Sequence, residues 1–469
     1  MRRYWIVAAS LLMLGLSGKP ILEKTLTFGK FGPVALYYPS AQPAHVALFI
    51  SGDGGWNLGV LDMARSLVGQ DTLVVGVDIL HYLRVLQSGE DPCLYPAADF
   101  EALSQFVQRE LGFPAYITPV LVGYSSGATL AYATLVQAPS TTFRGAISLG
   151  FCPDLLLSKP MCHGSGLRYE PGPKGKGYNF LPAPQLEVPW IVLQGQIDQV
   201  CAPAATASFV EQTATGELIS LPKVGHGFAV PRNWMPQFTD AFRRLANRQE
   251  DYLPPPRMDE LKDLPLLEIS PTGSARDALV VFLTGDGGYG VTDRGLCTAL
   301  AADGFPVVVL NSLRYFWTRR TPESAAADLQ RILQHYLSGW KKERVILIGY
   351  SMGADVLPFM VNRLTAGMRS RIAQLGLLGP GASVDFAFHL TDWFSGGARK
   401  SDLPVRPEIE KLRGTPILCL YGDQDSDSIC PGLDPALARV VLLKGGHRIG
   451  GNFSPVLEEI RKEISRKTP

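Results

Sequence analysis

The chain carries one set of landmarks twice, in the same order and at nearly the same spacing. An apolar run at 46–50 leads into SGDGGW, and a later apolar run at 279–283 leads into TGDGGY. GYSSGA at 123–128 is matched by GYSMGA at 349–354, and each is followed by a Gly-x-x-Asp turn and then by a glycine-rich loop with one histidine. A repeat on this scale predicts two consecutive domains of one fold.

The pattern of apolar residues predicts the α/β class for both halves. Short apolar runs bounded by glycine alternate with longer amphipathic stretches at 97–111 and 322–337. Such runs are typical of parallel strands joined by crossover helices. In the second stretch Thr321 can cap the helix and Pro322 suits its first position. Further strands are expected at 72–77, 120–122, 306–310 and 345–348.

The domain boundaries follow from length and composition. A chain of 469 residues with 46% hydrophobic residues exceeds the size of one ordinary core. Arg2, Arg3 and the apolar run at 4–16 predict a signal peptide over 1–17, cleaved near Ser17; a buried helix or an uncleaved anchor is the alternative. The predicted plan is then a first domain at 18–246, a linker at 247–277 that contains three consecutive prolines, and a second domain at 278–469.

Charge and cysteine content limit the function classes. The 44 basic and 43 acidic residues leave no basic footprint, which excludes a nucleic-acid binder. No metal-binding cluster or nucleotide loop is present in the sequence, so no cofactor is expected. Seven cysteines are compatible with disulfides in an oxidising compartment, and at least one must stay unpaired in a monomer. Cys201 and Cys430 follow the candidate acid loops closely, so they could either pin those loops or be buried thiols.

The Gly-x-Ser-x-Gly motif after a strand predicts a nucleophile in each half. In α/β-hydrolase-type domains this serine occupies a strained turn between strand and helix, which indicates Ser125 and Ser351. The fold class is therefore two tandem α/β-hydrolase-type domains, each a mainly parallel sheet flanked by helices. The same turn also occurs before ordinary helices, so the motif alone is a weak signal.

The acid and the base complete the chemistry. Serine needs a histidine to take its proton and a carboxylate to orient that histidine. In this fold the order along the chain is Ser, Asp, His, and both halves obey it. The candidates are Asp198 and His226 in the first half and Asp425 and His447 in the second. Asp423 and Asp427 are close enough in sequence to compete with Asp425.

Acyl transfer also requires donors for the oxyanion. One is usually the amide after the nucleophile, and the other comes from a loop after an early strand. The first criterion indicates Ser126 and Met352. The GDGG turns suit the second, although they could be tight turns only. Their candidate donors are Asp53, Gly54, Asp286 and Gly287.

The second half resembles the AcvB/VirJ family of bacterial virulence proteins. The matching stretches include TGDGGY, NSLRYFWTRRTPESAAADL, GYSMGADVLPFMVNRL, YGDQDSDSICP and KGGH, and the two-domain plan is also similar. The resemblance implies a periplasmic hydrolase of aminoacyl-phosphatidylglycerol, lysyl or alanyl, that acts at the membrane surface through Ser351, Asp425 and His447. It also implies association with virulence and with type IV secretion-system proteins.

The segment LRYFWTRR at 313–320 fits a lipid substrate. Arg314, Arg319 and Arg320 could bind the phosphate. Tyr315, Phe316 and Trp317 could meet an interface or acyl chain. The alternative is that the aromatic residues are core and the arginines a solvated face. For the whole chain, a general carboxylesterase or lipase and a non-catalytic periplasmic factor are the competing hypotheses.

Overall fold

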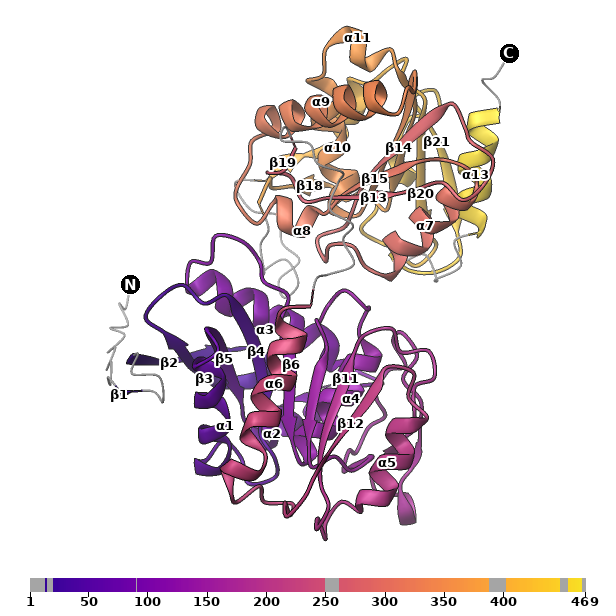
Figure 1. The fold of residues 1–469 in the computed structure, drawn as a ribbon. Coiled ribbons are helices and arrows are strands. Elements are labelled where there is room, and N and C mark those ends of the chain that lie inside the picture. The colour runs from indigo at the N-terminus through magenta and orange to yellow at the C-terminus, as the bar shows by residue number, and fades with distance from the viewer. Residues whose placement is uncertain are drawn as a thin grey trace, which may run out of the picture. The chain divides into compact units, whose positions relative to one another are not determined.

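The computed structural model describes residues 13–14, 20–89, 91–248, 261–387, 402–447 and 454–465. The chain forms two compact units, which divide near residue 250 except that residues 114–116 group with the second (Figure 1). The predicted cleavage site near Ser17 and the three consecutive prolines lie outside the described residues. Among the described helices, each is too short or too polar to cross a lipid bilayer.

The first unit contains a sheet of nine described strands in the order β1-β2-β3-β5-β4-β6-β7-β11-β12. The first three strands pair antiparallel with one another, and β3 is also antiparallel to β5. The remaining neighbours in this order, from β5 to β12, run parallel. Strands β5 and β11 are buried along their whole length, because helices cover both faces of the sheet. The strands are β1 Met13–Leu14, β2 Pro20–Phe28, β3 Gly32–Pro39, β4 His45–Ile50, β5 Thr72–Val77, β6 Val120–Tyr124, β7 Ala146–Leu149, β11 Trp190–Gly195 and β12 Gly216–Leu221.

Helices α1 and α6 pack on one face of this sheet, and α2 to α5 pack on the other. Figure 1 shows α6 crossing the front of the strands. A small sheet of β8 Asp154–Leu155, β10 Tyr178–Phe180 and β9 Tyr169–Pro171 lies beyond β7 in the chain. The helices are α1 Leu58–Val68, α2 Ile79–Ser88, α3 Pro96–Glu110, α4 Ser126–Gln137, α5 Pro203–Glu211 and α6 Met235–Ala246.

The second unit repeats this plan with fewer strands, in the order β13-β15-β14-β16-β17-β20-β21 among the described residues. β13 is antiparallel to β15, and the others run parallel. A two-stranded sheet joins β18 Ser383–Val384 to β19 Leu403–Pro404. The main strands are β13 Leu266–Ile269, β14 Ala278–Leu283, β15 Val307–Leu310, β16 Arg344–Tyr350, β17 Ile372–Leu378, β20 Ile417–Gly422 and β21 Ala438–Leu443.

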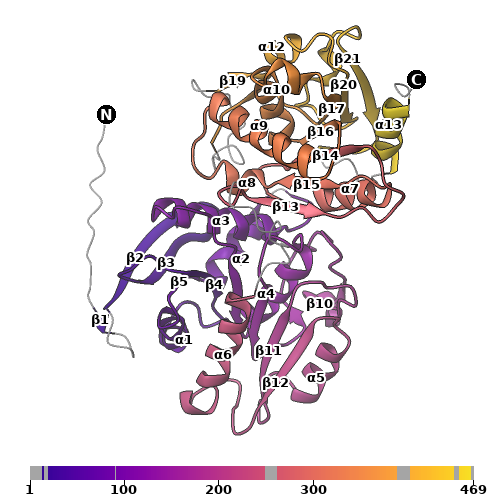
Figure 2. The ribbon, with the colours of Figure 1, turned by 45° about the horizontal axis from the view of Figure 1, so that its top comes forward.

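Helices α7 and α13 pack on one face of the second sheet, and α9, α10 and α12 pack on the other; Figure 2 shows them from a second direction. The predicted helix start is confirmed, since the Thr321 side chain accepts a hydrogen bond from the Ser324 amide and Pro322 is the first helical residue. The helices are α7 Val291–Ala302, α8 Ser312–Tyr315, α9 Pro322–Gly339, α10 Met352–Asn362, α11 Ala366–Arg369, α12 Val405–Glu410 and α13 Ser454–Ser465.

One sequence prediction is wrong at the start of the second unit. The linker was expected to continue to residue 277, but β13 (Leu266–Ile269) pairs with β15 as the edge strand of the sheet. Leu261 and Leu264 are also buried in the core of the second unit. The dense charge of this stretch favoured a solvated linker. Its leucines, however, are buried against the second unit, so the stretch belongs to that domain.

Candidate active site

Within each unit, the sheet brings the GDGG turn and the Gly-x-Ser-x-Gly turn together at the carboxyl ends of two neighbouring strands. In the first unit β4 pairs with β5 on one side and with β6 on the other, so the order of strands reverses there. The carboxyl ends of β4 and β6 lead into the GDGG turn and into Ser125. In open α/β sheets such a reversal is where ligands bind. The second unit has the same arrangement at β14 and β16, which lead into its GDGG turn and Ser351.

Each nucleophile lies on a strained backbone turn. Ser125 has φ 55° and Ser351 has φ 51°, in the left-handed region that L-residues rarely adopt. The turn is held by the Ser125 amide, which donates to Leu149 O at 2.9 Å, and by the Ser351 amide, which donates to Leu378 O at 2.9 Å. Strain of this kind exposes the serine hydroxyl above the sheet.

We predict that Gly349→Ala destabilises the second unit strongly. A Cβ atom at Gly349 would collide with the backbone carbonyl of Gly353, which a rotamer change cannot relieve. The free energy of unfolding should fall by about 3 kcal/mol or more. Gly367→Ala is the matched control, because a Cβ there meets no atom within 4 Å. Urea titrations would measure both, and equal stability of the two variants would contradict the packing argument.

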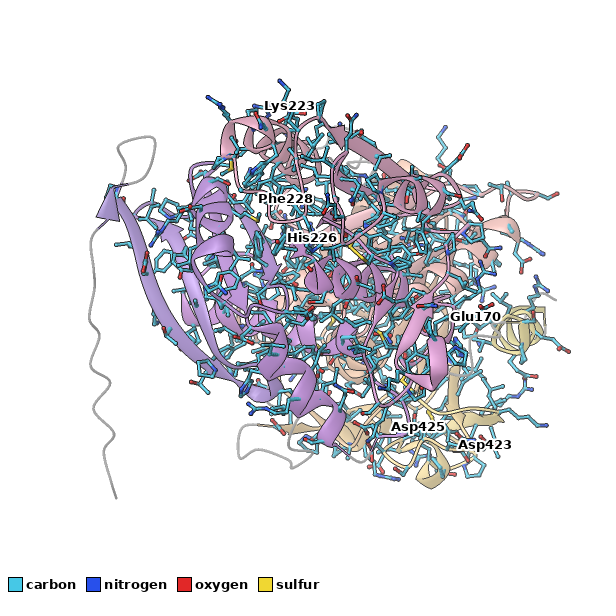
Figure 3. All side chains as sticks on the ribbon, turned by 90° about the horizontal axis from the view of Figure 1, so that it is seen from below. Glu170, Lys223, His226, Phe228, Asp423 and Asp425 are labelled. Atoms are coloured by element: carbon cyan, nitrogen blue, oxygen red, sulfur yellow. A yellow bond between two sulfur atoms is a disulfide. The ribbon has the colours of Figure 1, made fainter. Side chains whose placement is uncertain are left out.

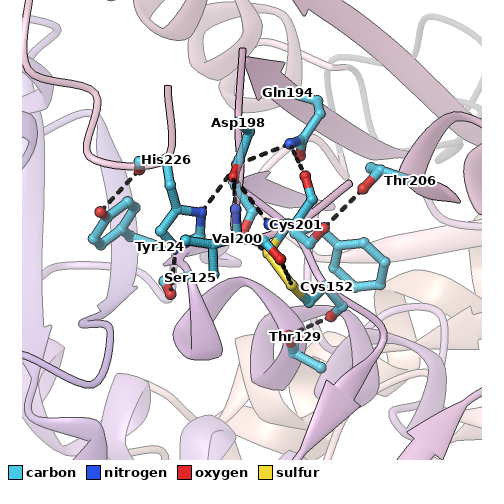
Figure 4. Close-up of a disulfide and its surroundings, with 12 residues drawn as sticks. Tyr124, Ser125, Thr129, Cys152, Gln194, Asp198, Val200, Cys201, Thr206 and His226 are labelled. Atoms are coloured by element: carbon cyan, nitrogen blue, oxygen red, sulfur yellow. Dashed lines mark hydrogen bonds and ion pairs between the residues drawn. A yellow bond between two sulfur atoms is a disulfide. The ribbon is translucent and has the colours of Figure 1, made fainter. Parts of the chain in front are cut away.

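The first unit holds a complete Ser-His-Asp arrangement. His226 Nε2 lies 2.9 Å from Ser125 Oγ, and His226 Nδ1 lies 2.9 Å from Asp198 Oδ2 (Figure 4). The three residues follow β6, β11 and β12, whose carboxyl ends share one edge of the sheet. The Tyr124 hydroxyl donates to the His226 carbonyl at 3.0 Å and so fixes the histidine loop.

The acid of the first unit is held by several donors. Gln194 Nε2 donates to Asp198 Oδ2 at 2.9 Å, and the amides of Val200 and Cys201 donate to Oδ1 at 2.8 and 2.9 Å. Burial alone would raise the pKa of Asp198, but the bonds from Cys201, His226 and Val200 lower that pKa below its ordinary value. The carboxylate therefore stays charged and can orient the imidazole.

The second unit forms the same arrangement with nearly the same distances. His447 Nε2 lies 2.9 Å from Ser351 Oγ, and Nδ1 lies 2.9 Å from Asp425 Oδ2. Figure 3 labels Asp425 beside Asp423, which was its competitor for the role of acid. Asp423 instead accepts a hydrogen bond from the Gly445 amide at 2.9 Å, and Asp427 accepts one from the Ser426 hydroxyl. Asp425 is thus the carboxylate that contacts the histidine.

Disulfides pin both acid loops, as the cysteine positions allowed. Cys152–Cys201 ties the first loop, and Cys419–Cys430 ties the second; Cys93–Cys162 is a third bridge, and Cys297 is a buried free thiol. Asp198, Cys201 and His226 lie close enough to resemble a metal site. Because the Cys201 sulfur is bonded to Cys152, it is not available as a thiolate ligand.

The predicted oxyanion donors fall into two groups. Met352 and Ser126 begin helices α10 and α4, and the first amides of a helix have no partner within it. Gly285 packs against the Ser351 side chain, which brings the GDGG turn beside the nucleophile. The Gly287 amide, however, donates to Asp286 Oδ1 at 3.1 Å. The amides of Asp286 and Gly287 both remain predicted second donors.

The same turn in the first unit lies equally close to its nucleophile. A Cβ atom at Gly52 would come within 3.1 Å of the Ser125 Cβ. Asp53 and Gly54 follow Gly52 directly and are exposed. Their amides thus remain the candidate donors of this unit.

The family model of the bacterial virulence protein VirJ matches residues 44–148 and 277–468, together more than half of the chain. The chain belongs to the VirJ family. The two matched regions contain both serine elbows and both GDGG turns of this VirJ-family protein. No curated protein matches the chain in sequence.

Several solved structures are similar to about half of this VirJ-family chain. An esterase domain from Rhodothermus marinus is 15% identical, with 51% of this chain and 97% of that chain covered and a TM-score of 0.32. A dienelactone hydrolase from Anabaena variabilis is 16% identical, with 48% and 96% covered and a TM-score of 0.34. A serine hydrolase from Xanthomonas campestris is 21% identical, with 48% and 91% covered and a TM-score of 0.30.

The structure of the LRYFWTRR segment does not match the lipid-binding role that the sequence predicts for it. Tyr315, Phe316 and Trp317 are 1%, 0% and 4% exposed, so their predicted contact with an interface is wrong. Arg319 forms a two-pronged ion pair with Asp385, at 2.8 and 2.7 Å. The Arg320 guanidinium lies 4.7 Å from the centre of the Tyr315 ring. These arginines therefore already have partners within the domain.

The backbone amide of Arg314 has a structural role at the start of a short helix. It donates to the Asn311 side chain at 3.1 Å, which caps the short helix α8. This contact explains the position of the backbone, and it leaves the predicted phosphate role of the side chain a prediction.

Two acidic residues of the second unit were missed by the sequence analysis. Asp355 lies one helical turn after the nucleophile, and its Oδ1 accepts a hydrogen bond from the Gly381 amide at 2.7 Å. Burial and the charges of Asp286 and Asp425 raise the pKa of Asp355 to about 8, although the bond from Gly381 opposes this. The position four residues after the serine in GYSMGAD was the available signal.

Asp293 is the second such residue, and it contacts the backbone just after the GDGG turn. Its Oδ2 accepts a hydrogen bond from the Gly290 amide at 2.9 Å. Burial and the charge of Asp286 raise its pKa to about 7, against the lowering effect of backbone hydrogen bonds. Asp293 thus helps to set the position of the turn that carries the Asp286 amide.

Proposed function

We propose that the second domain is a periplasmic serine esterase that cleaves the aminoacyl ester of aminoacyl-phosphatidylglycerol, with release of free amino acid and phosphatidylglycerol. The observation that carries this proposal is a carboxyl group, Asp355, one turn beyond a nucleophile that belongs to a hydrogen-bonded triad. An aminoacyl ester places an ammonium group one carbon away from the carbonyl that the serine attacks. A carboxylate beside the nucleophile is the natural partner for that cation.

The triad geometry supports the usual course of ester hydrolysis. His447 takes the proton of Ser351 as Oγ attacks the ester carbonyl, and Asp425 stabilises the imidazolium. The amides of Met352 and Asp286 would receive the oxyanion. Departure of the phosphatidylglycerol hydroxyl, which takes the proton from His447, leaves an aminoacyl-serine. Water then attacks this intermediate and releases the amino acid.

Three disulfides support the periplasmic location, because such bridges persist in oxidising compartments. The apolar run near the N-terminus predicts the export signal that this location requires. Action at the membrane surface and contact with secretion-system proteins are further proposals, which follow from membership of the VirJ family.

The proposal is tested by measuring free lysine and alanine released from lysyl- and alanyl-phosphatidylglycerol in mixed vesicles. Asp355→Asn should lower kcat/KM for the lysyl lipid about tenfold, since a hydrogen bond to a charged group is lost. Asp434→Asn is the matched control, because that exposed carboxylate bonds to Arg413. No release from either lipid by the wild-type protein would refute the substrate.

The same carboxyl predicts a pH dependence. With its pKa raised to about 8, Asp355 is mostly protonated in the empty site near neutral pH. Raising the pH from 6 towards 8 should therefore lower KM for the lysyl lipid, because the ionised carboxylate pairs with the α-ammonium; towards pH 9 KM should rise again as that ammonium, whose ordinary pKa is about 7.7–8.0, loses its proton. Steady-state kinetics across this range would show the trend in wild type. An identical trend in Asp355→Asn would assign it to another group.

A further inference from the structure

The two triads of this chain differ in the charge and polarity of the residues around them. Four residues after the nucleophile, the second unit has Asp355 and the first has Thr129. Both side chains bond to equivalent loops. Asp355 accepts from the Gly381 amide, whereas Thr129 donates to the Cys152 carbonyl at 2.6 Å. The carboxyl beside Ser351 is thus replaced by a buried, neutral hydroxyl beside Ser125.

The loops that carry the catalytic acids also differ in polarity, and the loop of the first unit is again the less polar one. Two residues after the acid, the second unit has exposed Asp427 and the first has Val200, which is 68% exposed. One residue before the acid, Ile197 is 61% exposed, and its counterpart Gln424 is polar. The first unit thus presents exposed branched apolar side chains on both sides of its catalytic carboxylate. They are suited to contact an apolar group of a ligand.

The first triad is also built as firmly as the second. The His226 side chain is 17% exposed, compared with 43% for His447, and Asp198 has three donors besides the imidazole. Phe228 has φ 47° and packs edge-on against Tyr124, which holds the histidine loop. Preorganisation of this quality is what acyl transfer requires, and a scaffold domain has no need of it.

We propose that the first domain is a second, independent esterase centre that accepts carboxylic esters with an uncharged, apolar acyl group. Ser125 Oγ attacks the ester carbonyl and passes its proton through His226 to the departing alcohol. Water then cleaves the acyl-serine and regenerates the hydroxyl. Ile197 and Val200 contact the acyl chain, and the shared GDGG turn supplies an oxyanion donor from Asp53 or Gly54.

The experiment uses the full-length protein and two esters with one leaving group, p-nitrophenyl butyrate and the p-nitrophenyl ester of lysine. Ser351→Ala should remove most hydrolysis of the lysine ester and keep that of the butyrate ester. Ser125→Ala should show the reverse. A fluorophosphonate probe should label Ser125 in the Ser351→Ala protein. A folded Ser351→Ala protein that is neither labelled nor active on butyrate would overturn the proposal.

A surface substitution tests the acyl preference without touching the triad side chains. In the Ser351→Ala background, Val200→Asp should lower kcat/KM for butyrate about tenfold, because the apolar chain meets a charge. Val200→Asn has the same size without the charge and should lose much less. Equal losses in the two variants would contradict the acyl contact. Lysine release from the lysyl lipid reports on the second domain only, so the two proposals can fail separately.

Discussion

Replacing Ser351 with alanine is expected to abolish lysine release from lysyl-phosphatidylglycerol, with kcat lower by roughly 10⁶-fold. The reason is geometric, since Ser351 Oγ lies 2.9 Å from His447 Nε2 and occupies the strained turn above the sheet. Alanine at this position removes the only atom that can form the acyl intermediate at this triad. Amino-acid analysis of the released products would measure the loss.

The controls separate loss of chemistry from loss of fold. Ser370→Ala removes a hydroxyl that bonds to the Gly367 carbonyl on the surface of the same unit, so it should keep full activity. Thermal unfolding of Ser351→Ala should remain close to wild type, because the substitution deletes one half-buried oxygen. A non-catalytic factor would behave differently, and a biological activity that persists in Ser351→Ala would favour that alternative.

The strands and the triads were within reach of the sequence because they depend on local pattern and chain order. The apolar run at 72–77 is β5 (Thr72–Val77), and the amphipathic stretch at 97–111 is α3 (Pro96–Glu110) with a one-residue offset at each end. Ser125, Asp198 and His226 are far apart in the chain, yet they meet because each follows a parallel strand of one sheet. The fold rule thus converts order along the chain into proximity.

Other features depend on contacts that no local pattern encodes. The Asp355 carboxyl is held by the amide of Gly381, which follows a different strand, and its pKa depends on the charges of Asp286 and Asp425. The aromatic residue Tyr315 appeared suited to an interface, but its hydroxyl bonds to Asp328 inside the core. The sequence predicts a phosphate ligand at Arg319, but its guanidinium pairs with Asp385. In each case the partner is more than ten residues away along the chain.

The choice of acid in the second domain predicts the other large effect. Asp425→Asn should lower kcat by about 10⁴-fold, because asparagine keeps the shape but favours the wrong tautomer of the histidine. Asp423 was a competing candidate in the sequence, but its Oδ1 accepts a hydrogen bond from the Gly445 amide, whereas His447 Nδ1 lies beside Asp425. Asparagine can accept the same amide through its own oxygen, so Asp423→Asn should change kcat little.

The comparison of these two variants identifies the acid directly. Both substitutions remove one negative charge from the same loop, so a general loss of local charge would affect them similarly. A large loss in Asp425→Asn alone requires a specific contact with the imidazole, as the 2.9 Å distance from His447 Nδ1 implies. If Asp423→Asn is the more damaging variant, the loop must rearrange when substrate binds, and Asp425 would lose its assignment as the catalytic acid.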